Sequence, residues 1–320
     1  MRRVVLTKSA LALGTLVFVL VFNFFLFRVA SDPELDIRRN NRLTPQQQDA
    51  LIEERGLREP LLAQFQIYVS DTVSGDLDTS YSSGRPVLTE IWEALPNTIL
   101  LVGSATLLAA LIGTWLGVVA GARRGKTSDT VITQGSLILY SMPEFWLGMV
   151  LIWLFASTLG AFPTGLKSDP GADLSGVSYV IDVLQHAALP IIVLTLGLLG
   201  QYVVIMRSAL TDVLNEDFVT TARAVGLPRY RVLRGHAVRN ALLPTVTLIA
   251  LNLGFVVSGA ITIEALFSWP GVGQLTVEAI DTNDIPMLQG IFLVTSFAVI
   301  FANLIADLTV TYLDPRVRVS

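Results

Sequence analysis

The chain has 320 residues, of which 52% are hydrophobic and only 15% are charged, and its mean hydropathy is +0.61. This composition is typical of a protein that crosses a membrane several times and excludes an ordinary soluble domain, so the formal net charge of -4 says little by itself. The chain has no cysteine, which excludes disulfides and Cys-based metal sites, and its two histidines lie too far apart in sequence to replace one. We therefore expect no redox chemistry and no metal site.

Six segments are long and apolar enough to be membrane spans, because a helix needs about 20 apolar residues to cross the hydrocarbon core. They lie at about 10–30, 98–122, 131–159, 187–206, 242–267 and 287–313. The fold class is thus all-α, a polytopic membrane protein with six transmembrane helices. For the first segment the alternative is a cleaved signal peptide, since basic residues precede its apolar run and small residues follow it. The run is, however, longer than a usual signal core.

Residues 31–96 are too polar to lie in the membrane. Pro45 to Arg55 is predicted to be a helix capped by Thr44, and Pro60 to Val73 a second helix that ends before Gly75. We expect small helices packed over the mouth of a pore. The predicted parts are a first transmembrane helix at 1–30, an extracytoplasmic helical segment at 31–96, and a five-helix core at 97–320 with a cytoplasmic loop at 207–242.

The distribution of lysine and arginine predicts the orientation, because short basic loops stay in the cytoplasm. With the amino terminus inside, the two short outer loops hold only Lys167. The outer segment 31–96 is long and carries twelve acidic residues, so its arginines weigh less in the rule. Both termini are expected to be cytoplasmic. The basic residues of the inner segments are Arg2, Arg3, Lys8, Arg123, Arg124, Lys126, Arg207, Arg223, Arg229, Arg231, Arg234, Arg239, Arg316 and Arg318.

The second span carries a glycine at every fourth position, namely Gly113, Gly117 and Gly121. This spacing predicts a flat helix face against which another helix packs closely, either as a fixed contact or as a sliding surface during pore opening. The following Gly125, Lys126 and Thr127 resemble part of a phosphate-binding loop. The first glycine of that loop is missing and no strand precedes it, so we interpret these residues as a topology anchor.

Ionisable groups inside spans are costly and usually face the interior of a helix bundle. Glu144 follows Pro143 near the middle of the third span, where a bent helix and a carboxylate predict either a wet translocation path or a paired structural group. Glu264 and Asp307 lie nearer the ends of spans, where water is accessible. Polar residues of the fifth span are predicted to form inter-helix hydrogen bonds or to line the path: Asn252, Ser258 and Thr262.

The loop from Arg207 to Leu242 is the most informative stretch, because it is polar and arginine-rich between two apolar spans. Asn215 is predicted to cap a first helix, Gly226 to end it at positive φ, and Pro228 to lie in the first turn of a second helix that ends near Pro244. The predicted product is a helical hairpin on the membrane surface that offers a docking site to a partner. The alternative is an amphipathic loop resting on lipid headgroups.

With these elements in place, the sequence resembles the permease subunits of the ABC importers for dipeptides, oligopeptides and nickel over essentially its whole length. The motif from Thr221 to Leu227 and from His236 to Pro244 is similar to the cytoplasmic coupling motif of that family. The family's glutamate at the start of the motif is Thr220 or Thr221 here, a replacement that the peptide branch tolerates. Further matches are Leu95 to Thr98, Pro143 to Gly148, Phe267 to Gly273, Gly75 to Leu77 and Asp314 to Arg318.

The resemblance implies a type I ABC importer permease in the inner membrane of a prokaryote. It also implies a second homologous permease, two ATPase subunits that bind ATP and Mg²⁺, and an extracytoplasmic substrate-binding protein. No cofactor is expected on this chain, no nucleic acid among its partners and no catalytic residue. The residues expected to contact the ATPase are Glu216, Thr221, Ala222, Arg223, Ala224, Gly226, Leu227, Tyr230 and Arg231.

Other classes of function remain open from the residues alone. An ion-coupled carrier works without an ATPase, but usually shows repeated halves with broken helices and buried charge clusters, whereas this chain has only scattered acids. A receptor or scaffold with a basic loop is another alternative. Within the importer class, the cargo is expected to be di- or oligopeptides, with nickel or another small solute as the alternative.

Overall fold

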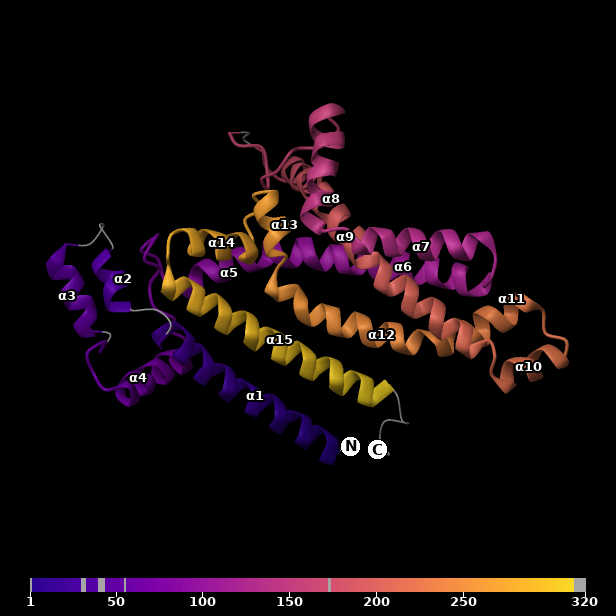
Figure 1. The fold of residues 1–320 in the computed structure, drawn as a ribbon, viewed down its shortest axis with the longest axis horizontal. Helices are drawn as coiled ribbons and strands as arrows, with labels where there is room; N and C mark the ends of the chain where they lie inside the picture. Colours follow the sequence, from indigo (N-terminus) through magenta and orange to yellow (C-terminus); the bar gives the residue numbers. More distant parts are fainter. Residues whose placement is uncertain (1, 30–32, 40–43, 55, 172–173, 314–320) are drawn as a thin grey trace. The chain divides into compact units, whose positions relative to one another are not determined.

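The computed structural model describes residues 2–29, 33–39, 44–54, 56–171 and 174–313. The described residues form helices and contain one isolated bridge between Thr79 and Pro86 but no named strand (Figure 1). The chain divides into two compact units, Met1–Asn97 with Gly271–Ser320, and Thr98–Pro270. The matching tail Asp314 to Arg318 lies outside the described residues.

Unit 1 contains the amino-terminal helices and the last two helices of the chain. Its helices are α1 (Arg2–Val29), α2 (Pro33–Arg39), α3 (Pro45–Glu54), α4 (Leu61–Ser74), α5 (Val87–Thr98), α14 (Val272–Asp281) and α15 (Ile285–Leu313).

The outer part of unit 1 follows the local signals of the sequence. Thr44 Oγ1 accepts the backbone N–H of Gln47 at 3.3 Å and Gln47 Oε1 accepts that of Thr44 at 2.9 Å, so the predicted cap of α3 is confirmed. The second predicted helix is also confirmed as α4, which ends at Gly75 in the left-handed conformation with φ 84°. The short helix α2 was not predicted.

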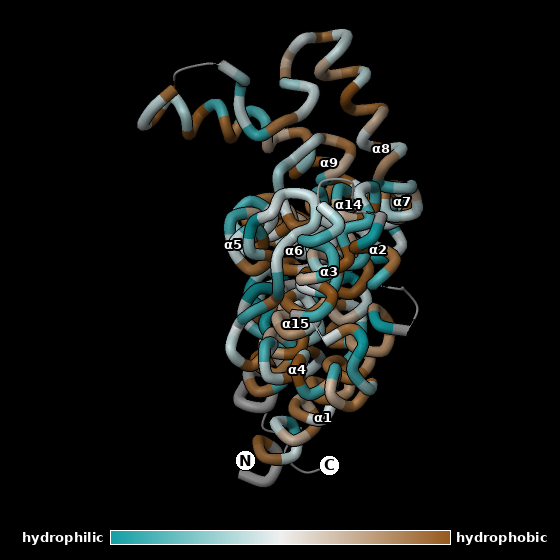
Figure 2. Tube along the Cα trace, turned by 90° about the vertical axis from the view of Figure 1, so that its left-hand side faces the viewer, coloured by the Kyte–Doolittle hydropathy of each residue, from teal (hydrophilic) through white to brown (hydrophobic). Residues whose placement is uncertain are grey.

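Helices α1 and α15 pack along each other in unit 1. The tube is largely hydrophobic along α1 (Figure 2), as expected of a helix that faces lipid. Lys8 Nζ and Asp307 Oδ2 form an ion pair at 2.8 Å, and Asn23 Nδ2 donates to Gln289 O of α15 at 3.3 Å and to Tyr68 OH of α4 at 2.9 Å. Polar side chains thus join the apolar helices at two levels.

Unit 2 holds the remaining helices. They are η1 (Ile99–Gly103), α6 (Ser104–Ala122), α7 (Thr127–Ser141), α8 (Glu144–Leu151), η2 (Ile152–Thr158), α9 (Val177–Val213), α10 (Asp217–Ala224), α11 (Arg229–Arg231), η3 (Val232–Ala237), α12 (Val238–Phe255), η4 (Val256–Ser258) and α13 (Ile261–Leu266).

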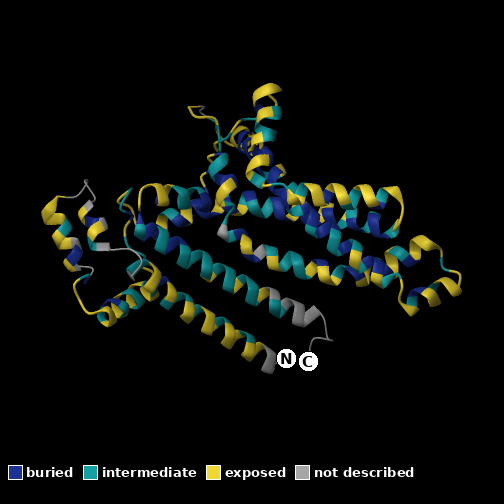
Figure 3. Ribbon diagram, viewed as in Figure 1, coloured by how far each residue is buried: buried dark blue, intermediate teal, exposed yellow. Residues whose placement is uncertain are grey.

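Helix α9 lies at the centre of unit 2, because α6, α7, α8 and α12 all pack against it. Figure 3 shows many of its residues as buried. The main apolar core includes Leu101, Val193, Ile263 and Trp269, which come from four separate segments. Because α13 packs into this core, Glu264 is fully buried. Its carboxylate accepts the backbone N–H of Ala260 at 3.3 Å. The expectation that Glu264 reaches water is therefore wrong.

The predicted spans are present as apolar helical segments, but two of them are not straight. The third bends by 99° between Ser141 and Glu144, at Pro143. The fifth stops as an α-helix at Phe255 and turns at Gly259, whose φ is 76°. Four helices among the described residues are long and apolar enough to cross a membrane, or five if the bent pair is one span, so the count of six is not confirmed.

Candidate functional site

The predicted hairpin is present between α9 and α12. Its first helix, α10, begins after Glu216, which has an extended N-cap conformation with ψ 153°. The predicted cap at Asn215 is therefore wrong by one residue. Asp217 lies in the first turn, where a negative charge is favourable near the N-terminal N–H groups.

Gly226 makes the turn between the two arms of the hairpin. Its φ is 87°, a value that costs glycine little and other residues much more. Its N–H donates to Arg223 O at 3.0 Å and that of Leu227 donates to Ala222 O at 3.2 Å, so the last carbonyls of α10 are satisfied. A Cβ on Gly226 would meet no atom within 4 Å. The positive φ at this glycine is thus confirmed, and the space around it is open.

The second arm differs from the prediction in length. Pro228 precedes α11 with ψ 145° and does not lie in its first turn. The arm then remains helical through Pro244 to Phe255, because α11, η3 and α12 follow one another without a break. The predicted end near Pro244 is therefore wrong. The arm is continuous with the helix that packs on α9.

The outer face of the hairpin is exposed, as Figure 3 shows for α10 and α11. Val225 is 78% exposed and Tyr230 is 61% exposed, although both are large and apolar or aromatic. Of the residues predicted to contact the ATPase, only Ala222 and Leu227 are half-buried. The exposed ones are Glu216, Thr221, Arg223, Ala224, Gly226, Tyr230 and Arg231.

A few contacts attach the hairpin to the rest of unit 2. Within the hairpin, α10 packs against η3, with Val219 fully buried and Val232 at the start of η3 1% exposed. Arg229 Nη2 donates to the carbonyl oxygen of Ala122 at 2.8 Å, which satisfies a carbonyl at the end of α6. Ala237 and Ala241 belong to a buried cluster with Met206 and Leu210 of α9. A force on the hairpin would thus reach both α6 and α9.

An ion pair that the sequence analysis missed lies beside this attachment. Both oxygens of Asp129 at the start of α7 accept N–H groups of Arg207 near the end of α9, one of them at 2.9 Å from Nη2. Asp129 also accepts the Gly125 N–H at 3.0 Å. The signal in the sequence was a carboxylate and an arginine, each at the border of an apolar span. The pair joins α7 to α9.

The three spaced glycines of α6 face α9. A Cβ on Gly113 would lie 2.6 Å from Tyr202 Cβ, and one on Gly117 would lie 2.7 Å from Met206 Cβ and 2.8 Å from Val203 O. One on Gly121 would lie 3.1 Å from Leu210 Cδ2. The two backbones approach so closely that side chains do not fit between them.

The residues predicted to line a path occupy different positions. Glu144 is half-buried at the first turn of α8 and lies against α9, where a Cβ on Gly197 would be 3.0 Å from its Oε1. Asn252 Nδ2 donates to Tyr202 OH at 2.8 Å, so it joins α12 to α9. Thr262 is exposed on α13. The side chain of Ser258 lies outside the described residues.

The sequence of this chain is similar to those of named proteins. Residues 113–319 match the family of binding-protein-dependent transport system inner membrane components. The chain belongs to this family.

Three relatives match over nearly their whole length. The oligopeptide transport system permease protein AppB of Bacillus subtilis is 31% identical over 98% of both chains. The dipeptide transport system permease protein DppB of Escherichia coli is 33% identical over 99% of both. The di/tripeptide transport system permease protein DppB of Pseudomonas aeruginosa is 34% identical over 97% of both. The predicted all-α importer permease is thus confirmed, and the chain is a membrane transport component, not an enzyme.

Proposed function

We propose that this chain forms half of the translocation path of an ATP-driven importer of di- or oligopeptides, together with a second homologous permease. The names of the matched relatives support peptides as the cargo. An extracytoplasmic binding protein would deliver the peptide, and the binding-protein dependence in the family's description supports this part of the proposal.

The hairpin is the proposed contact with the ATPase subunits, which bind ATP and Mg²⁺. The observation that carries this proposal is the exposed apolar tip around Gly226, with Val225 78% and Tyr230 61% exposed, attached directly to α6 and α9. Aromatic and apolar side chains that fill a partner's pocket supply much of the binding energy of an interface. Arg223 and Arg231 beside the tip can pair with acidic groups at the rim of that pocket.

The orientation follows from the same assignment. The hairpin and both termini lie in the cytoplasm of a prokaryote, and residues 31–96 lie outside the inner membrane. The excess of lysine and arginine in the inner loops supports this orientation. Glu144, Asn252, Ser258 and Thr262 are the residues we assign to the path.

The test replaces the glycine at the tip of the hairpin. Gly226→Trp should abolish ATP-driven peptide uptake by the reconstituted importer while leaving membrane insertion intact, because the indole would occupy the space that the ATPase must enter. The matched control is Gly75→Trp, since Gly75 also ends a helix at φ 84° in open space. Both variants carry a similar backbone strain of about 1–2 kcal/mol. The control should insert and transport normally.

Normal uptake by Gly226→Trp would contradict the coupling role. Co-purification separates the alternative classes of protein. An importer permease should be isolated with two ATPase subunits, whereas an ion-coupled carrier or a receptor should not. Uptake driven by an ion gradient without ATPase subunits would favour the carrier.

A further inference from the structure

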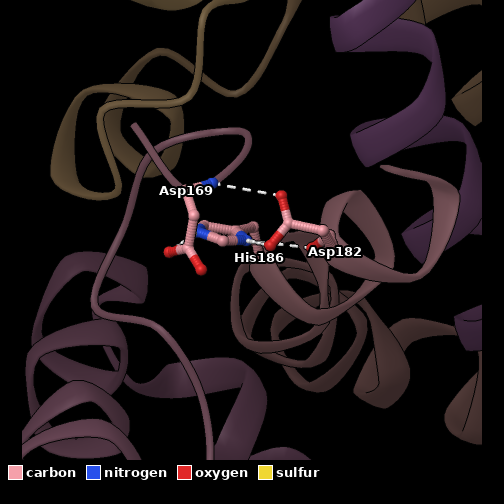
Figure 4. A group of neighbouring side chains, drawn as sticks. All are labelled: Asp169, Asp182 and His186. Atoms are coloured by element: carbon pink, nitrogen blue, oxygen red, sulfur yellow. Dashed lines mark hydrogen bonds and ion pairs between the residues drawn. The ribbon is translucent and has the colours of Figure 1, made fainter. Parts of the chain in front are cut away.

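Three side chains outside the hairpin and the path lie together in unit 2: Asp169, in the segment before α9, and Asp182 and His186, one turn apart on α9 (Figure 4). Their possible ligand atoms all lie within 4.8 Å of one another. Asp182 and His186 are buried, while the side chain of Asp169 is 68% exposed. The group therefore connects a buried helix face with solvent.

The hydrogen bonds of His186 determine which ring nitrogen carries a proton. Nδ1 lies 2.9 Å from the backbone oxygen of Asp182. Because a carbonyl oxygen only accepts, Nδ1 must be the donor. In a neutral imidazole, Nε2 then keeps its lone pair.

The lone pair of Nε2 faces the carboxylate of Asp169. The distance from Nε2 to Asp169 Oδ1 is 3.6 Å, longer than a hydrogen bond. The His186 side chain is only 2% exposed. A buried acceptor thus points at a second acceptor, an arrangement that a cation between them would satisfy.

Asp182 holds both groups in place. Its Oδ2 accepts the backbone N–H of Asp169 at 3.1 Å, and its backbone oxygen fixes the His186 tautomer. In Figure 4 the carboxylates of Asp169 and Asp182 lie on opposite sides of the imidazole. Metal-bound histidines usually have this support, with the second ring nitrogen donating to a carbonyl or carboxylate.

We propose that His186 Nε2 and the Asp169 carboxylate bind a divalent transition-metal ion such as Zn²⁺, with Asp182 as the residue that positions both. Ligand atoms on one tetrahedral zinc ion lie about 3.4 Å apart, close to the 3.6 Å found here. The exposed side of Asp169 leaves room for water ligands. Two carboxylates beside one neutral imidazole also give the net negative charge that a divalent cation requires.

Zinc titration of the assembled transporter in nanodiscs tests this site, with calorimetry as the measurement. The wild type should bind one Zn²⁺ that is lost in His186→Gln. Asp182→Asn should weaken this binding by about ten- to a hundredfold, the usual effect of removing a supporting partner. Asp169→Asn, at an exposed position, should weaken it at least tenfold without affecting folding. His236→Gln is the control, because His236 is the other histidine of the chain and lies exposed on η3. Binding that none of the first three changes weakens would overturn the proposal.

Selective ¹⁵N-histidine labelling gives a second, independent measurement, since the chain has two histidines. Nε2 of His186 should be unprotonated without metal and should shift on addition of Zn²⁺, while the signals of His236 stay unchanged. A His186 ring that is doubly protonated at neutral pH and indifferent to Zn²⁺ would show an ion pair with Asp169 in place of a metal site, and would overturn the proposal.

Discussion

The contact between α6 and α9 and the hairpin of α10 and α11 are opposite kinds of structure within one unit. In the contact between α6 and α9, a Cβ on Gly117 would lie 2.7 Å from Met206 Cβ, so the helices leave no space for a larger side chain. At the second, a Cβ on Gly226 meets nothing within 4 Å. Glycine thus serves close packing in one place and an exposed turn in the other. We infer that substitutions in the first region affect folding, and those in the second affect coupling.

The largest effect on stability is expected at the close contact. Gly117→Ala should destabilise unit 2 by about 2 kcal/mol, because the added methyl group overlaps backbone and Cβ atoms of α9. Gly135→Ala is the control, since a Cβ there meets no atom within 4 Å and alanine favours a helix by up to about 1 kcal/mol. Thermal unfolding of the purified variants measures both. Equal melting temperatures for the two variants would show that α6 and α9 do not approach as closely as described.

The smallest effect is expected at Glu144, which belongs to neither region. Its half-buried carboxylate forms no ion pair within the described residues and lies against Gly197. If it lines the path, Glu144→Gln should change the kcat/KM of peptide uptake about fivefold, the equivalent of about 1 kcal/mol, and by different factors for different peptides. Glu53→Gln, on the exposed side of α3, is the control and should behave as wild type. Unchanged kinetics across peptides would make Glu144 a structural residue.

Local signals predicted the parts of the fold that depend on a few neighbouring residues. Thr44 and Gln47 satisfy the free N–H groups at the start of α3, and Gly75 and Gly226 adopt positive φ where their helices end. The four-residue spacing of Gly113, Gly117 and Gly121 indicated one helix face, but the partner helix could not be read from it. Only the three-dimensional structure shows that the partner is α9.

Features that depend on distant segments were not predicted. The fifth span appeared continuous because its residues are predominantly apolar, whereas Gly259 interrupts it and α13 returns to the core. Asp129 and Arg207 are 78 residues apart, so only the fold brings them together. The sequence predicted no metal site because the chain has no cysteine and its two histidines lie far apart, whereas the site proposed above combines one histidine with carboxylates that the fold brings to it.

The central claim is that the hairpin tip contacts a separate ATPase subunit, and cross-linking tests it most directly. Val225→Cys introduces a single thiol into a chain without cysteine. Val73→Cys on α4 is the matched control, because Val73 is 79% exposed and Val225 is 78% exposed. With a short thiol-reactive photo-cross-linker, we expect the thiol of Val225→Cys to capture the ATPase subunit and that of Val73→Cys not to. Capture of the ATPase from Val73→Cys, or none from Val225→Cys, would contradict the account.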